Sequence, residues 1–238
     1  MAGSDVAGAR VGRVLDAAGE LLVRWGYQRV TIDEVARHAG IGKGTVYLHF
    51  RTKDALFLAV LLRAQAGVAE RAAQRAEADP EHAMPARLVR TLYLELSADP
   101  VLRAMYLSDV EILGRLAHEA ADTIGELTAH RDHVLDEHLR LLREAGCLRA
   151  DLTLPEMRYT FDAIATGFIV VDGFSGSHRP PPLAVEERAD LLERAIAAAI
   201  QVPEPPAAEL ARVAPAVAQL YRSLLDHIDH DEWRPRGR

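Results

Sequence analysis

The sequence predicts an all-α protein with a small N-terminal three-helix domain and a larger C-terminal helical domain. Apolar residues recur at helical spacing along most of the 238-residue chain. Aromatic residues make up only 5% of it, whereas alanine, leucine and arginine are abundant. No run of alternating β-branched residues lies between turn signals, as a strand would require. The length fits two domains, which we expect at residues 1–53 and 54–238.

The N-terminal domain begins with an amphipathic helix expected at residues 11–25. Thr31 and Glu34 then have the T-x-x-E spacing of a capping box, in which each side chain satisfies a backbone donor of the other residue. The apolar residues that follow predict a short helix ending before Gly40. Glycine just past a helix end readily takes the left-handed conformation, so we expect a sharp turn there.

A second short helix is predicted from Gly42 or Lys43 to Phe50. Val46 and Phe50 lie four residues apart and should face inward together. The side chains left to face outward are those of Lys43, Thr45, Leu48 and His49, with Tyr47 at the flank. Two short helices joined by a glycine-containing turn, with such a face on the second, are typical of a helix-turn-helix. The second helix of that motif enters the major groove of DNA.

The residue types on this face suit a nucleic acid. Lysine, threonine, tyrosine and histidine can bind phosphate oxygens, and threonine and leucine can contact a thymine methyl. Leu48 either reads such a methyl or packs on the first helix. Thr52 should cap the next helix and places Lys53 in its first turn. A cation there opposes the helix macrodipole, which makes sense if a phosphate lies opposite.

Residues 11–58 closely resemble the DNA-binding domain of the tetracycline-repressor-like (TetR) transcriptional regulators, a resemblance that covers about a fifth of the chain. The resembling residues are Trp25-Gly26-Tyr27, Thr31-Ile32, Val35-Ala36, Ala39-Gly40-Ile41, Gly44-Thr45-Val46-Tyr47, His49-Phe50, Lys53 and Leu56. Two positions depart from the common pattern. Gly42 stands where a serine often caps the recognition helix, and Leu48 is apolar where polar residues are frequent.

The resemblance implies a homodimer that binds a palindromic operator in double-stranded DNA, usually represses transcription and leaves DNA when a small-molecule effector enters the C-terminal domain. With the outward face described above, we expect DNA contacts from Thr31, Gly42, Lys43, Gly44, Thr45, Tyr47, Leu48, His49 and Lys53. Tyr47 and Lys53 are expected on phosphates, and Lys43 and Thr45 on base edges.

The charge distribution is compatible with this function although the net charge is −7. Residues 1–53 carry eight Lys and Arg against five Asp and Glu, a net +3, so the remaining chain carries −10. Phosphate binding requires a basic surface locally and not a basic protein as a whole.

Composition also indicates the compartment. Cys147 is the only cysteine, so no intrachain disulfide can form, which fits a reducing cytoplasm. The N-terminus has no apolar signal-peptide core, and no stretch approaches the roughly 20 apolar residues of a membrane span. We expect a cytoplasmic protein with no membrane association.

The C-terminal domain should begin in a long helix at residues 52–76, which is apolar at first and then charged. Further helices are expected at residues 85–97, 100–107, 109–145, 155–172, 184–201 and 207–228. Two of them carry apolar stripes, namely Phe161, Ile164, Phe168 and Val171 on one and Leu192, Ile196 and Ile200 on the other. The resemblance implies that these helices pair with their mates in a four-helix dimer interface. The alternative is that both stripes belong to the intrachain core.

An effector site is implied by the resemblance and only indicated by the residues. Aromatic, soft or polar residues within apolar helices are the candidates: Tyr93, Met105, Tyr106, Asp109, Tyr159 and Asp162. Each of them can equally be a core or edge residue. Asp162 can also simply pair with Arg158, four residues before it.

One alternative function comes from another class. His118, His130, His133 and His138 crowd residues 118–138, and a helical metal-binding protein or enzyme could use them. We favour the regulator, because paired surface histidines usually bind nothing. Residues 40–45 lack the spacing of a phosphate-binding loop, and no catalytic triad is evident. We therefore expect no enzyme activity, no bound metal and no cofactor.

Overall fold

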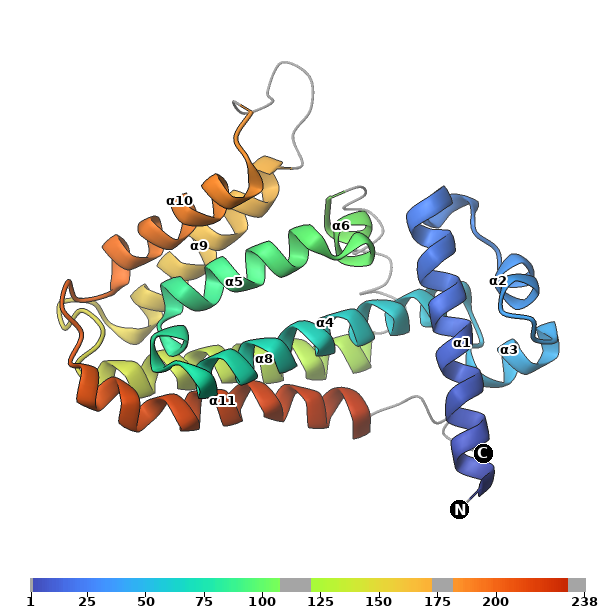
Figure 1. Ribbon diagram of the computed structural model, residues 1–238, viewed down its shortest axis with the longest axis horizontal. Coiled ribbons are helices and arrows are strands. Elements are labelled where there is room, and N and C mark those ends of the chain that lie inside the picture. The colour runs from blue at the N-terminus through green and yellow to red at the C-terminus, as the bar shows by residue number, and fades with distance from the viewer. Residues whose placement is uncertain (1, 108–120, 173–181, 231–238) are drawn as a thin grey trace. The chain divides into compact units, whose positions relative to one another are not determined.

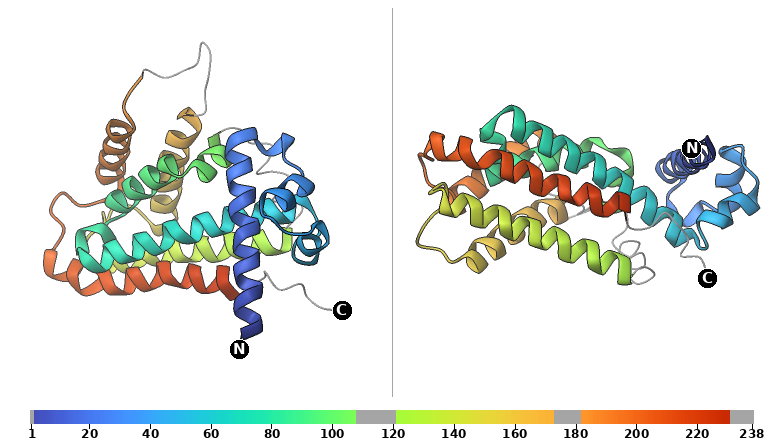
Figure 2. Two further views of the ribbon diagram at one scale, coloured as in Figure 1. Left: turned by 45° about the vertical axis from the view of Figure 1, so that its right-hand side comes forward. Right: turned by 90° about the horizontal axis from the view of Figure 1, so that it is seen from below.

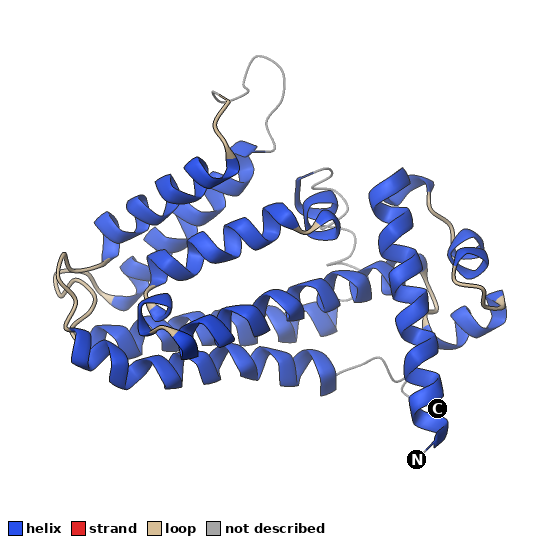
Figure 3. Ribbon diagram, in the orientation of Figure 1, coloured by secondary structure: helices blue, strands red, loops and turns tan. Residues whose placement is uncertain are grey.

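The computed structural model describes residues 2–107, 121–172 and 182–230, and these ranges are helical apart from turns and loops (Figures 1 and 3). An isolated β-bridge between Leu148 and Gln201 is the exception. The elements are α1 (Ala2–Trp25), the 3-10 turn η1 (Tyr27–Arg29), α2 (Ile32–His38), α3 (Lys43–His49), α4 (Lys53–Ala78), the 3-10 turn η2 (Pro80–Ala83), α5 (Pro85–Ala98), α6 (Pro100–Leu107), α8 (Ala121–Glu144), α9 (Leu154–Asp172), α10 (Val185–Ile200) and α11 (Ala207–His230). The all-α prediction is confirmed.

Two helices differ from their predicted bounds. α1 begins at Ala2 and not at residue 11. Hydrophobic periodicity marks where a helix is buried, and residues 8–10 are exposed, so the apolar pattern starts later than the helix does. The helix predicted at residues 109–145 is described as α8 from Ala121 onward, because residues 108–120 lie outside the described ranges.

The chain divides into two compact units. Unit 1 comprises the described parts of residues 1–65, 99–126 and 228–238, and unit 2 comprises those of residues 66–98 and 127–227. Unit 1 therefore extends beyond residue 53 along α4. Leu56 and Phe57 of α4 are fully buried, and the Phe57 ring meets the Tyr27 ring edge-on with 5.1 Å between centroids. Each such apolar side chain stabilises the unit by about 1.5–3 kcal/mol.

In unit 2, α4, α8 and α11 lie side by side, and α10 packs against both α5 and α9 (Figures 1 and 2). Four alanines of α4 lie in the core they share: Ala69, Ala72, Ala73 and Ala76. Such small residues let neighbouring helices approach closely. None of the described helices is both long and apolar enough to cross a lipid bilayer.

Candidate nucleic-acid interface

The first helix of the predicted motif, α2, starts with the expected capping box. The Thr31 hydroxyl oxygen accepts the backbone N–H of Glu34 at 3.3 Å. In return, the Glu34 carboxylate accepts the backbone N–H and the hydroxyl of Thr31, both at 2.8 Å. These bonds satisfy backbone donors that the first turn of a helix leaves without partners. The side chain of Thr31 thus caps α2 and is at the same time exposed to solvent.

The turn between the helices depends on Gly40, whose φ of 64° lies in the left-handed region. Its N–H donates to the Arg37 carbonyl at 3.3 Å, and the next N–H, of Ile41, donates to the Ala36 carbonyl at 2.9 Å. This pair of bonds is a Schellman motif, which ends a helix and reverses the chain. Glycine takes such a φ without the steric penalty of a Cβ, so residue 40 directs the chain into α3.

The second helix, α3, is attached to unit 1 by one inward face. Val46 is fully buried and Phe50, its C-cap, is nearly so. The opposite face is open to solvent, with Leu48 at 70% and Tyr47 at 43% exposure. The exposure of Leu48 shows that its side chain is not packed on the first helix. Gly42 is the N-cap and has no side chain to bond the first turn.

Of the nine residues expected to contact DNA, the exposed ones are Thr31, Gly42, Lys43, Gly44, Tyr47 and Leu48, and the half-buried ones are Thr45, His49 and Lys53. All nine are therefore open to solvent at least in part. They come from three elements, namely the start of α2, the whole of α3 and the start of α4.

The two lysines of this surface are held by neighbouring groups. The Lys43 ammonium lies 2.6 Å from the Asp33 carboxylate of α2 and 5.7 Å from the centroid of the Tyr47 ring. The hydrogen bond to Asp33 is the main cause that raises the pKa of Lys43. Lys53 lies over the Tyr27 ring, 4.1 Å from its centroid, and its ammonium donates to the Gln28 carbonyl at 3.4 Å. Sequence reasoning missed Asp33, because the ion pair joins two different helices.

The candidate effector residues with described side chains lie in three different surroundings. Tyr93 is buried in the core of unit 2, and Tyr159 is 77% exposed on α9. Asp162 accepts a hydrogen bond from Arg158 at 2.7 Å, so the pairing alternative is the one observed. The side chains of Met105 and Tyr106 are not described, and Asp109 lies outside the described residues.

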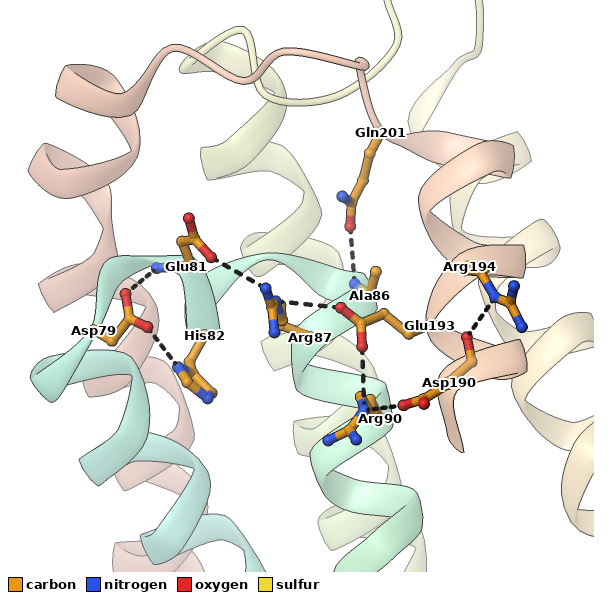
Figure 4. A network of polar contacts seen from close by, with 10 residues as sticks. All are labelled: Asp79, Glu81, His82, Ala86, Arg87, Arg90, Asp190, Glu193, Arg194 and Gln201. Carbon is orange, nitrogen blue, oxygen red and sulfur yellow. Dashed lines mark hydrogen bonds and ion pairs between the residues drawn. The ribbon is translucent and has the colours of Figure 1, made fainter. Parts of the chain in front are cut away.

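A pocket of about 430 Å³ opens in unit 2 among η2, α5, α10 and the start of α11, and the described candidate effector residues Tyr93, Tyr159 and Asp162 do not line it. Its charged side chains all take part in ion pairs, Asp79 with His82 and the other three with one another (Figure 4). Arg87 bonds Glu81 at 3.3 Å and Glu193 at 3.2 Å. The Gln201 amide oxygen accepts the backbone N–H of Ala86 at 2.9 Å. These polar side chains of the pocket therefore already have partners within the protein.

The histidines do not gather into a metal site within the described ranges, where no group of three or more candidate ligands lies close enough to hold an ion. His130 bonds the Ser223 hydroxyl at 3.1 Å, and its ring centroid lies 6.5 Å from that of His133. His138 is fully buried in the core. His118 lies outside the described residues.

The residues expected at a dimer interface point mostly into their own subunit. Leu192, Ile196 and Ile200 of α10 are fully buried in the core of unit 2, where no partner can reach them. On α9, Phe161 is buried and Ile164 and Phe168 pack partly against the same core, while Val171 is exposed. The prediction selected the inward faces, because apolar residues occur on more than one side of both helices.

Exposed apolar or small residues also occur on both helices, on α10 beside the exposed charged residues Glu187, Asp190 and Arg194. On α9, the exposed residues Tyr159, Ala163, Thr166, Gly167 and Val170 recur at helical spacing. On α10, Leu191 and Ala198 are exposed, seven residues apart. These residues form what we call the outer α9–α10 face.

Comparison with known proteins identifies the type of domain that the N-terminal part of the chain forms. Residues 14–60 match the family model for bacterial regulatory proteins of the tetR family. The transcriptional activator FasR of Mycolicibacterium smegmatis is 46% identical over 54 residues, which are 23% of this chain and 25% of FasR. The chain thus matches about a quarter of the length of this curated relative.

The fold is shared over a longer range. The structure of SmeT, the repressor of the Stenotrophomonas maltophilia multidrug efflux pump SmeDEF, superposes with a TM-score of 0.57 at 21% identity, covering 82% of this chain and 96% of SmeT. FadR from Bacillus subtilis, solved with stearoyl-CoA, gives 0.55 at 17% identity, covering 77% of this chain and 96% of FadR. With the helix-turn-helix of α2 and α3 at the matched residues, the N-terminal domain of the chain is a domain of the kind found in bacterial regulatory proteins of the tetR family.

Proposed function

We propose that the chain is a ligand-responsive transcriptional regulator that binds double-stranded DNA through α3. The observation that carries this proposal is the way α3 is built. Val46 holds the helix to unit 1, while Lys43, Tyr47 and Leu48 stand out from it. Apolar and aromatic side chains on an exposed face of a soluble domain commonly mark an interaction surface. Together with a cation, they suit contacts to the base edges and phosphates of a major groove.

We further propose a homodimer that binds a palindromic operator. The support is the outer α9–α10 face, whose small residues allow a second helix pair to approach closely. A two-fold dimer uses the same patch on both subunits, and it presents two α3 helices to half-sites about 34 Å or a multiple apart. This face replaces the buried stripes as the proposed interface.

The proposed effector is a small molecule that binds in unit 2 and releases the protein from DNA, so that the regulator acts as a repressor. The names of two structural neighbours support it: SmeT is a repressor, and FadR was solved with stearoyl-CoA. The helix α4 supplies residues to both units and is one covalent route for the change. DNA and effector then favour different conformations, and each weakens the binding of the other.

The test starts with selection of an operator from random DNA by the full-length protein. Fluorescence anisotropy then compares the selected duplex with a scrambled one at several salt concentrations. We expect selective, salt-sensitive binding. Equal affinity for both duplexes, or no binding at micromolar protein, would refute the proposal.

Two variants test the interface itself. Tyr47→Ala should weaken binding to all sequences, because its expected partner is a phosphate, and Thr45→Ala should change the sequence preference. Gln74→Ala is the control, because Gln74 is exposed on the unit 2 part of α4 and should leave DNA binding unchanged.

A further inference from the structure

The Lys43 ammonium at the start of α3 is bound by an acid from the other helix of the motif. Asp33, in the first turn of α2, places its Oδ1 atom 2.6 Å from the Lys43 Nζ atom. The Lys43 Nζ atom also lies over the Tyr47 ring, 5.7 Å from the ring centroid. The lysine is thus held between α2 and the next turn of its own helix.

Two opposing electrostatic effects act on the charge of Lys43. At the first position of α3 a cation is disfavoured by the helix macrodipole, and the Asp33 carboxylate offsets this. The pair is exposed on both sides, so it is weak and screened by salt. A group of the DNA can therefore compete with Asp33 for the ammonium.

The effect of Asp33 on DNA binding depends on whether the group that competes for Lys43 is a base edge or a phosphate. An ammonium has three N–H donors, so Lys43 can bind an acceptor on a base edge while one donor stays on Asp33. The phosphates of a non-matching duplex do not lie at one fixed position relative to α3, so the flexible lysine reaches more of them when it is released from Asp33. The carboxylate thus penalises phosphate contacts more than base-edge contacts.

We propose that Asp33 is a specificity-determining residue of the DNA interface, which positions Lys43 for a base edge and suppresses non-specific phosphate binding. Asp33 acts through Lys43 and is a positioning residue. This inference rests on the proposed function.

The test is Asp33→Asn, which removes the charge at nearly constant size. Binding of the full-length variant to the selected operator and to a random-sequence duplex is measured against salt concentration. One additional phosphate contact should make the random duplex bind about three- to tenfold tighter and steepen its log–log salt slope by about 0.9. Operator affinity should change by less than about twofold, so the specificity ratio should fall.

Three variants separate positioning from simpler effects. Asp16→Asn removes the same charge from unit 1, where Asp16 pairs with Arg63 at 2.8 Å, and should leave the ratio unchanged. Asp33→Glu keeps the acid and should restore much of the ratio. In a Lys43→Gln background, Asp33→Asn should have no further effect on the ratio, because its target is gone.

The outcomes are distinguishable. Equal fold-changes on both duplexes, or the same loss of ratio with and without Lys43, would overturn the inference and leave Asp33 as a general repulsive charge or a helix stabiliser. If circular dichroism shows that Asp33→Asn does not fold, Lys43→Gln alone decides: it should lower the specificity ratio, and an unchanged ratio would overturn the inference. If the unmodified protein shows no sequence preference, the proposed function fails instead.

Discussion

The Nε2 atom of His138 lies 2.7 Å from the carbonyl oxygen of Ala83, and this contact fixes the tautomer of a fully buried imidazole. A carbonyl only accepts hydrogen bonds, so Nε2 carries the hydrogen. Nδ1 then accepts the hydroxyl hydrogen of Tyr221, whose oxygen lies 3.1 Å away. Burial lowers the pKa of His138 to about 4 and raises that of Tyr221. The pair joins η2, α8 and α11 in its neutral form.

The first prediction is a loss of stability in mild acid that depends on His138. Its pKa is depressed from 6.5 to about 4 in the folded state, so the unfolded chain takes up the proton first. The stabilisation contributed by neutral His138 is fully present above pH 6.5 and declines as the pH falls toward 4. Between pH 7 and pH 5 this one group should remove about 2 kcal/mol from the free energy of unfolding.

Urea unfolding at the two pH values measures this effect. In His138→Gln the extra decline should disappear, whatever the absolute stability of the variant, because glutamine does not titrate. His133→Gln is the matched control, since His133 is exposed on the same helix. An identical pH dependence in the native protein and in His138→Gln would contradict the prediction.

The second prediction separates folding from recognition within α3. Leu48→Ala should change the free energy of unfolding by no more than about 0.5 kcal/mol, because the side chain is exposed. It should alter the preference for thymine at one operator position. Val46→Ala removes a buried side chain and should cost roughly 2 kcal/mol. Thermal melting measures the stability of the two variants, and a base-substitution series of the operator measures their sequence preference. A large loss of stability in Leu48→Ala would contradict the prediction that this side chain does not contribute to the core.

The third prediction concerns Gly44, the second residue of α3. A Cβ there meets nothing within 4 Å, and alanine is the better helix former. Gly44→Ala should therefore stabilise the fold by up to about 1 kcal/mol. The added methyl stands on the surface that we propose to approach DNA, so operator affinity should fall. Gly12→Ala on α1, where a Cβ also meets nothing within 4 Å, should stabilise without weakening binding. A Gly44→Ala protein with unchanged affinity would argue against close approach of α3 to the duplex.

The fourth prediction tests the outer α9–α10 face. Val170 is 49% exposed, so Val170→Glu should leave the subunit folded. Two like charges brought together at a two-fold interface are destabilising, and the dimer should dissociate to monomers with a loss of operator affinity. Analytical ultracentrifugation measures the mass, and Val23→Glu, at an exposed valine of α1, is the control. A dimer that persists in Val170→Glu would move the interface elsewhere.

The sequence predicted the parts of the site that depend on neighbouring residues. The capping box of Thr31 and Glu34 spans three residues, and the turn at Gly40 depends on its own φ. Both were predicted and both are observed, because such interactions form within one helical turn. The inward direction of Val46 follows in the same way from the helical repeat.

Other parts required contacts that sequence spacing does not reveal. The Asp33–Lys43 pair joins two helices across a turn, and Arg158 binds Asp132 of α8 at 2.6 Å in addition to Asp162, which the sequence spacing had offered as its partner. The face that α10 turns toward the core is a third feature that sequence spacing does not reveal. Leu191 and Leu192 are adjacent in sequence, yet the first is exposed and the second is buried.

The sequence by itself determined the helical class, the two short helices and the residues that α3 presents, because helix caps, turns and hydrophobic periodicity are local properties of the chain. Only the tertiary structure decided which apolar face of α9 and α10 is core and which acids of other helices pair with Arg158 and Lys43. Those outcomes depend on which helices become neighbours, and packing energies between distant segments decide that.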